Sequence, residues 1–340
     1  MSAEHHRIDI HYHVIPEPYV RALGKRGIRG STYVTFPSWT PETALKHLDR
    51  TRTRAAITSL STPGVWFGDA GLARELSRLC NEFQARMVAD HPERFGSFAT
   101  LPLPDTGAAL EELDYALDTL GHDGVVLLSD VDGRYLGHPD YEELFAELDR
   151  REAVVFIHPH DDPRTRKRYE VLSPLLEWPI HTTRAALDLL FSGRLARYPN
   201  IRYILAHGGG LTPFLAHRAT GGDRDSLALL RDLFYDTAAP GEGHLAALRT
   251  FCGPGRLLFG TDGGWTPPVQ TKLAIRELLK HDGFTAGEMA AIEFGNASGL
   301  FPRFEASREE RTHPSTTVTL VRNTQADREA VDAEIRTASA

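Results

Sequence analysis

Short apolar runs alternate with amphipathic stretches along most of this chain of 340 residues. This alternation predicts strand–helix units, and runs that are apolar throughout predict parallel strands covered by helices on both faces. Eight runs fit the description: RIDIH (7–11), RAAITSL (54–60), RFGSFAT (94–100), GVVLLS (124–129), AVVFIHPH (153–160), IRYILAH (201–207), LFYDTA (233–238) and RLLFGTD (256–262). Eight units in about 300 residues predict an α/β fold, the TIM (β/α)8 barrel.

A doubly wound open sheet is the structural rival, because it is built from the same units. Dinucleotide-binding sheets of that kind carry a Gly-rich phosphate loop after the first strand. Here the residues after the first run read HVIPEP (13–18). This sequence favours the barrel.

Two segments depart from the alternation. Residues 14–45 form a long insertion after the first strand, punctuated by Gly and Pro, which would lie at the barrel mouth as a cap. Residues 304–340 are charged and rich in Ser, Thr and Arg. We therefore expect one barrel over residues 1–303 and a polar C-terminal tail over 304–340, partly disordered or packed on a partner subunit.

Charge and cysteine content exclude several classes of function. The net charge is −8, from 38 Lys and Arg against 46 Asp and Glu, so no basic surface for nucleic acid or anionic membrane is expected. Cys80 and Cys252 lie far apart and outside any CxxC pair, which argues against a disulfide framework and a cysteine zinc site. No apolar run approaches the ~20 residues of a membrane span. These features predict a protein of the reducing cytoplasm.

Residues that can bind a metal end four of the eight predicted strands. His11 and His13 end the first, His158 the fifth, His207 the sixth and Asp262 the eighth. Side chains two apart on a strand share a face, so both histidines of HYH would face the barrel interior. Barrel enzymes keep their chemistry at the carboxyl ends of the strands. Because imidazole and carboxylate are ligands of zinc and similar ions, the joint pattern predicts an open, catalytic type of metal site.

The chain resembles the amidohydrolase superfamily in five short stretches and one long block. The short stretches are IDIHYHVIP, GVVLLS, VVFIHPH, LLFGTD and FGNASGLF, and the block runs from His181 to Arg218. They resemble the decarboxylase branch typified by aminocarboxymuconate-semialdehyde decarboxylase. RFGSFATLPLPD and LDYALDTLGHDGVVLLSD are most similar to the 6-methylsalicylate decarboxylases of that branch. The likeness covers the whole predicted barrel.

The resemblance implies that His11, His13, His158 and Asp262 bind one divalent metal ion. It also implies that His207 is the catalytic acid or base, with Asp262 as a second candidate for the proton donor. Binuclear relatives carry a carboxylated Lys or an acid on the fourth strand, whereas GVVLLS has neither. We therefore expect a single ion, Zn²⁺ or, as the alternative, Mn²⁺.

Substrate contacts are assigned more weakly. In the family an arginine in the region of Arg218 binds the substrate carboxylate, in some members from the neighbouring subunit, so a homodimer is expected. His160 and Trp265 are further candidates at the mouth, and Asp236, which ends the seventh strand, could orient a ligand histidine. The family's arginine in the insertion has no evident match, and His160 replaces an aromatic residue. Both differences argue against a muconate substrate.

Three functions are compatible with these residues to different degrees. The first is a metal-dependent, non-oxidative decarboxylase of a small aromatic acid of the ortho-hydroxybenzoate type, or of an unsaturated acid. The second is a mononuclear hydrolase or hydratase, in which metal-activated water attacks a small ester, lactone, amide or double bond. The third, a non-catalytic barrel that binds a ligand, predicts a missing metal ligand, and none is missing.

Overall fold

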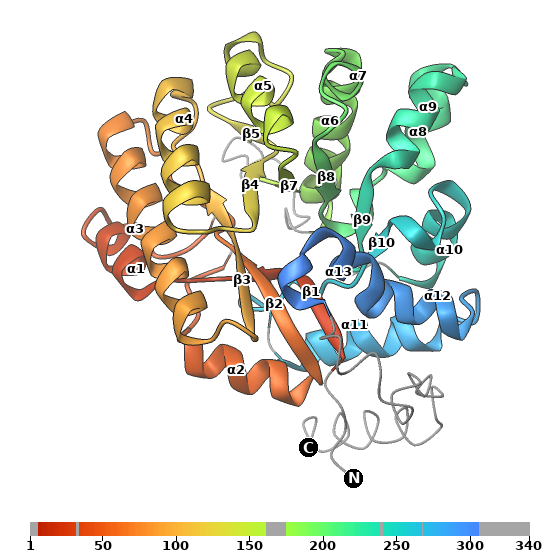
Figure 1. Ribbon diagram of the computed structural model, residues 1–340, viewed down its shortest axis with the longest axis horizontal. Helices are drawn as coiled ribbons and strands as arrows, with labels where there is room; N and C mark the ends of the chain where they lie inside the picture. Colours follow the sequence, from red (N-terminus) through yellow and green to blue (C-terminus); the bar gives the residue numbers. More distant parts are fainter. Residues whose placement is uncertain (1–5, 32–33, 161–174, 239–240, 267, 306–340) are drawn as a thin grey trace.

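A computed structural model describes residues 6–31, 34–160, 175–238, 241–266 and 268–305. Eight parallel strands form one sheet in the order β1-β2-β3-β4-β7-β8-β9-β10, and helices surround it (Figure 1). The strands of this sheet are β1 (Arg7–His13), β2 (Thr53–Ser59), β3 (Phe95–Thr100), β4 (Gly124–Leu128), β7 (Val154–His158), β8 (Arg202–Leu205), β9 (Phe234–Asp236) and β10 (Leu257–Leu258). Each falls within or next to a predicted run, so the eight-strand prediction is confirmed.

The first and last strands of the sheet meet. The Ile10 N–H donates to Phe259 O (3.0 Å), and the Asp262 N–H donates to His11 O (2.9 Å). These two bonds join β1 to the chain that leaves β10. The sheet is thereby nearly closed into the predicted barrel.

Helices follow the strands and cover the outside of the sheet (Figure 1). Five of them begin at side-chain caps, where a Thr or Asp accepts the N–H of the residue three positions later. The caps are Thr40, Asp69, Asp105, Asp223 and Thr285. The helices are α1 (Glu17–Gly24), α2 (Pro41–Arg50), α3 (Ala70–Asp90), α4 (Thr106–Asp114), α5 (Glu142–Arg150), α6 (Glu177–Phe191), α7 (Arg194–Arg197), α8 (Thr212–Thr220), α9 (Arg224–Asp232), α10 (Glu242–Phe251), α11 (Pro268–Lys280), α12 (Ala286–Ala290) and α13 (Asn296–Leu300).

Apolar side chains from the strands fill the barrel interior. Phe98 of β3 stacks on Phe156 of β7, with ring centroids 5.5 Å apart. Phe301 and Phe304, after α13, pack against the same cluster. Truncating a buried phenylalanine in such a core costs about 3–5 kcal/mol. The interior is therefore a packed core that supports the polar residues at the strand ends.

Strand β1 carries a bulge at its histidines. Two of its residues, Ile10 and His11, lie opposite the single residue Ile57 of β2. In a regular strand the side chains of two adjacent residues point to opposite faces, so only one of these two would face the barrel interior. Nevertheless Ile10 packs in the interior cluster, and the His11 ring contacts the interior Phe156, with centroids 5.0 Å apart. A bulge re-aims the side chains that follow it, which explains how apolar residues and histidines of one strand share the interior.

The structure also bears on the segments outside the alternation. The insertion over 14–45 contains α1 and the start of α2, and residues 306–340 of the predicted tail lie outside the described residues. The sequence did not predict the small antiparallel hairpin of β5 (Asp130–Val131) and β6 (Arg134–Tyr135) after β4. None of the helices in the described ranges is long and apolar enough to cross a membrane.

Candidate metal centre

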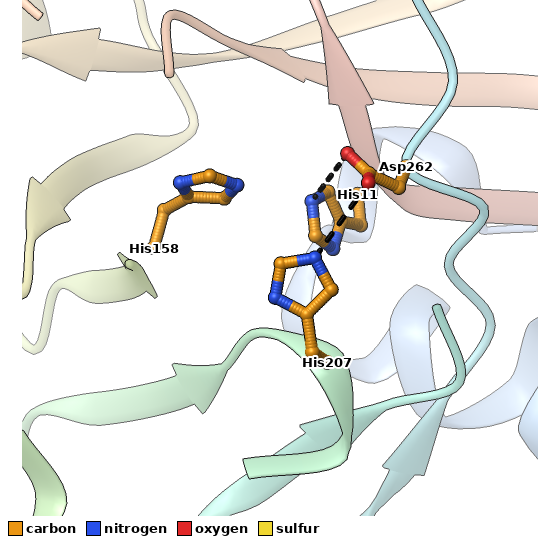
Figure 2. Close-up of side chains that lie close together, drawn as sticks. All are labelled: His11, His158, His207 and Asp262. Carbon is orange, nitrogen blue, oxygen red and sulfur yellow. Dashed lines mark ion pairs between the residues drawn. The ribbon is translucent and has the colours of Figure 1, made fainter. Parts of the chain in front are cut away.

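Four residues from different strand ends converge at one point of the barrel. They are His11 of β1, His158 of β7, His207 after β8 and Asp262 after β10 (Figure 2). Each offers one ligand atom, and these atoms all lie within 4.8 Å of one another. Figure 2 shows the ion pairs that join His11 and His207 to Asp262.

His13 reaches the same point from the strand that carries His11. Its Nε2 lies 3.1 Å from Nε2 of His11 and 3.0 Å from Oδ1 of Asp262. The structure therefore brings together all five residues that the sequence singled out at the strand ends. At this distance either a proton or a metal ion lies between the two nitrogens, because two unprotonated Nε2 atoms would face each other with lone pairs.

The other ring nitrogen of each β1 and β7 histidine is held by the protein. The His11 Nδ1–H donates to Oδ2 of Asp236 (2.6 Å), and the His158 Nδ1–H donates to Pro159 O (2.8 Å). The His13 Nδ1 lies 3.1 Å from Oγ of Ser59. Such bonds fix the tautomer and aim the Nε2 lone pair at a metal. The predicted orienting role of Asp236 agrees with this contact.

His158 gives the clearest sign that the residues fit a cation. Its Nε2 is buried and has no hydrogen-bond partner among the described residues. A buried polar atom without a partner costs free energy, so native structures seldom keep one without a reason. Because Nδ1 of His122, outside this cluster, is also buried without a described partner, the sign of a cation is that the His158 ring converges with the other ligands.

The electrostatics also favour a cation. Burial would lower the pKa of His11, but the Asp236 and Asp262 carboxylates outweigh it and raise that pKa to about 10. Burial and the neighbouring histidines hold the pKa of His158 well below its ordinary value, so this ring is neutral. Burial would raise the pKa of Asp262, but hydrogen bonds from His11 and other histidines hold it well below the usual range. The carboxylates thus stabilise one positive charge among rings that are mostly neutral.

Strained backbone carries two of the five residues. His207 and Asp262 have φ angles of +54° and +56°, a region that costs residues other than Gly of order 1–3 kcal/mol. After His207 the chain continues through Gly208, Gly209 and Gly210, all with positive φ. A Cβ at Gly210 would lie 2.1 Å from Pro179 O. The three glycines are therefore required for the turn that presents His207.

Three contacts hold this turn in place. The Gly208 N–H donates to Oδ1 of Asp236 (3.0 Å), and the His244 Nε2–H donates to Gly208 O (3.1 Å). The Leu211 N–H donates to Oγ1 of Thr183 (2.7 Å). Asp236 thus connects the turn to His11, because its other oxygen binds that ring.

A largely apolar cavity lies at the same rim. It lies at the carboxyl ends of β2, β3 and β4, and His160 borders it two residues after His158. Its lining consists of Leu60, Pro63, Gly64, Val65, Trp66, Thr100, Leu101, Leu103, Val126, Leu127, Leu128, Val131 and His160. The lining is thus mostly hydrocarbon, with Thr100 and His160 as its polar side chains.

Residues 8–303 match the family model of the amidohydrolases. This chain belongs to the amidohydrolase family.

Individual relatives agree with this membership. The chain is 37% identical over 327 residues to a 6-methylsalicylic acid decarboxylase of Aspergillus aculeatus, covering 88% of this chain and 97% of the relative. A crystal structure of an amidohydrolase is similar with a TM-score of 0.82 and 29% identity, over 87% of this chain and 99% of the other. A dihydroxybenzoic acid decarboxylase of Polaromonas, with bound manganese and an inhibitor, shares the fold with a TM-score of 0.74 and 22% identity, over 88% and 98% of the two chains.

The predicted substrate contacts fall in three different places on this amidohydrolase. His160 borders the cavity, and its backbone N–H donates to Oγ of Ser129 (3.1 Å). Trp265 is half-buried and packs beside Phe36, with ring centroids 5.6 Å apart. Arg218 lies on the exposed side of α8. Only His160 is among the residues that line the cavity.

Sequence reasoning missed two contributors to the amidohydrolase site. Trp178, in the first turn of α6, places its ring centroid 5.8 Å from that of His158 and 5.9 Å from that of His207. It lies in a helix far along the sequence from both, so no strand-end rule points to it. His244, in α10, holds the turn after His207 through its bond to Gly208 O. The HxH spacing marks a ligand pair, whereas nothing comparable marks a lone helical histidine.

Proposed function

We propose that this chain is a metal-dependent, non-oxidative decarboxylase of an ortho-hydroxy aromatic carboxylic acid. The observation that carries the proposal is the convergence of His11, His13, His158 and Asp262, with a buried Nε2 that lacks a described partner. The relative from Aspergillus aculeatus is named for decarboxylation of such an acid. Membership of the family and the cluster together favour this chemistry over a ligand-binding barrel.

His11, His13, His158 and Asp262 would hold one divalent ion. When bound, the ion supplies Lewis acidity and a template for the substrate carboxylate and the adjacent hydroxyl. Histidine and carboxylate accept both zinc and manganese. We favour Zn²⁺, and the bound manganese of the Polaromonas decarboxylase keeps Mn²⁺ as the alternative.

His207 would deliver the proton that starts the reaction. Its side chain is 12% exposed and that of Asp262 is 15% exposed, whereas His11 and His158 are fully buried. The two exposed groups can therefore approach a substrate. A proton added to the ring carbon that bears the carboxylate breaks aromaticity. The bond to the carboxylate then cleaves, its electrons return to the ring, and CO₂ leaves. Histidine is the side chain that most often transfers protons in enzymes, which suits this step.

The largely apolar cavity would receive the ring substituent. Leu60, Leu101 and Val131 line the cavity with hydrocarbon, and His160 supplies a polar group at its border. Trp178 and Trp265 are candidates to wall the ring, the former because it contacts both His158 and His207. An apolar substituent such as methyl suits this lining better than a hydroxyl, because a buried hydroxyl needs a partner.

A homodimer would bring Arg218 to a substrate. The exposed face of α6 and α8 carries Phe191, Phe214 and Leu215, which are 65%, 55% and 37% exposed. Arg218 follows Phe214 and Leu215 at helical spacings of four and three, so it lies on the same side of α8. An exposed apolar patch of this kind commonly marks a protein interface. We propose that a second copy covers it and takes Arg218 into its own site.

The remaining assignments extend the same proposal. We propose a single barrel over residues 1–303 with a cap-like insertion over 14–45. Phe304, the first residue of the predicted tail, packs in the interior cluster, and residues 306–340 lie outside the described residues. A cytoplasmic enzyme is supported by two free cysteines, Cys80 and Cys252.

The deciding experiment measures metal content and CO₂ release together. Purified protein is assayed with 6-methylsalicylate, salicylate and 2,6-dihydroxybenzoate, with and without a chelator. We expect about one ion per chain and chelator-sensitive CO₂ release. The kcat/KM for the methyl compound should exceed that for the dihydroxy compound by about tenfold or more, the scale set by one group in an apolar pocket. One ion per chain without CO₂ from any acid would replace the decarboxylase by a hydrolase or hydratase.

A further inference from the structure

We infer that Asp9 is a positioning residue that fixes both ends of the metal-ligand set through hydrogen bonds to the backbone beside His11 and Asp262. The inference rests on the proposed metal site. Asp9 lies two residues before His11 on β1 and is 1% exposed. It does not face the converging ligand atoms as a ligand itself, so its effect must pass through the chain.

The first of these hydrogen bonds lies at the bulge in β1. Ile10 and His11 lie opposite the single residue Ile57, so the regular ladder of β1 and β2 is interrupted at this point. The His11 N–H donates instead to Oδ1 of Asp9 (3.0 Å). A buried N–H needs such a partner. The Asp9 carboxylate therefore stabilises the local conformation that turns His11 into the barrel.

The other hydrogen bonds of Asp9 reach the chain that follows β10. The Thr261 N–H donates to Oδ1 of Asp9 (3.1 Å), and the Thr261 hydroxyl donates to Oδ2 (2.5 Å). The same hydroxyl accepts the Gly263 N–H (3.2 Å). Thr261 and Gly263 flank Asp262, whose φ is +56°. Asp9 thus holds the backbone on which Asp262 adopts its strained conformation.

A single side chain, the Asp9 carboxylate, accepts both sets of hydrogen bonds. A ligand from β1 and a ligand from the chain after β10 are far apart in sequence, and Asp9 binds the backbone next to each. Bonds that orient metal ligands from outside typically change metal affinity by 10- to 100-fold when they are removed. A merely structural carboxylate would change stability and leave metal affinity unaltered.

The test compares Asp9→Ala with a matched control at the other end of β1. Glu293 is also a buried carboxylate that contacts β1, where it accepts from Nε of Arg7 (2.6 Å). Zn²⁺ affinity is measured by competition with a chelating dye, and the visible spectrum of the Co²⁺-loaded protein reports ligand geometry. Thermal unfolding of the metal-free proteins is measured in parallel.

We expect Asp9→Ala to weaken Zn²⁺ binding by 10- to 100-fold and to alter the Co²⁺ spectrum. Asp9→Asn keeps an acceptor for both N–H groups, so it should recover most of the affinity. Thr261→Val, which removes only the hydroxyl contacts, should lose a few-fold. Glu293→Ala should unfold at a lower temperature and bind Zn²⁺ like the wild type.

Two results would overturn the inference. One is Zn²⁺ affinity of Asp9→Ala within about twofold of the wild type, with an unchanged Co²⁺ spectrum. The other is an equal loss of affinity in Glu293→Ala, which would reduce the effect to general destabilisation. If Asp9→Ala does not fold, Asp9→Asn and Thr261→Val carry the comparison. A wild-type protein that binds neither ion overturns the proposed metal site itself, and the role of Asp9 with it.

Discussion

Buried histidines lie at both ends of this barrel, and they differ in what their nitrogens face. At the carboxyl ends of the strands, His158 keeps a neutral ring with Nε2 aimed at the other ligands. Two residues before the amino end of β4, His122 is also buried, and its Nε2–H donates to Asn81 O (3.2 Å). Burial lowers the pKa of both. Burial and a low pKa therefore do not identify a functional histidine, whereas lone pairs that converge with those of other ligands do.

The largest effect is expected from His158→Ala. Removing one ligand should empty the site and lower kcat/KM by about 10³- to 10⁴-fold, the loss of several kcal/mol of charge stabilisation. Metal analysis and CO₂ release measure both quantities. His122→Ala is the matched control, since it should lower the stability of the fold and retain the ion. If His158→Ala retained its metal ion, His158 would not differ from His122 in function, and the comparison between the two ends of the barrel would fail.

A smaller effect is expected from His207→Gln, and it separates proton donor from ligand. The variant should lose about 10²- to 10⁴-fold in kcat, the range of general acid catalysis, and keep one ion per chain. His13→Gln should lose the ion instead. Both are measured on the same preparations. The opposite pattern would make His207 the fourth ligand and His13 a supporting residue.

The smallest effect concerns the amino end of β4 and appears as a pH dependence of stability. Burial lowers the pKa of His122 to about 4, against about 6.5 in the unfolded chain. Stability from the neutral ring is therefore complete above pH 6.5 and declines as the pH falls towards 4, by up to about 3 kcal/mol. His122→Gln should lose this dependence, as measured by urea unfolding of chelated protein across that range. His217→Gln, at an exposed helical position, is the control for loss of an imidazole. An identical pH profile of stability for His122→Gln and the wild type would contradict the prediction.

Strand number, barrel topology and the five polar strand ends could all be predicted from the sequence. Each depends on a local pattern, because apolar runs mark strands and the carboxyl ends of parallel strands must share one rim. The residues that complete the site could not be predicted. The bulge at Ile10 and His11 depends on the register with β2. Trp178 reaches the cluster through the packing of α6. Both are properties of long-range contacts that no short window of sequence contains.

The turn after His207 also limits how the protein can be redesigned. A Cβ at Gly210 would collide with Pro179 O in the first turn of α6, and Thr183 of the same helix holds the Leu211 N–H. Loop and helix are separated by many residues in sequence, but they are in direct contact at Gly210 and at Leu211. A chimera that imports residues 207–211 from a relative must import α6 as well. Recombination libraries should therefore treat these two segments as a single exchangeable block.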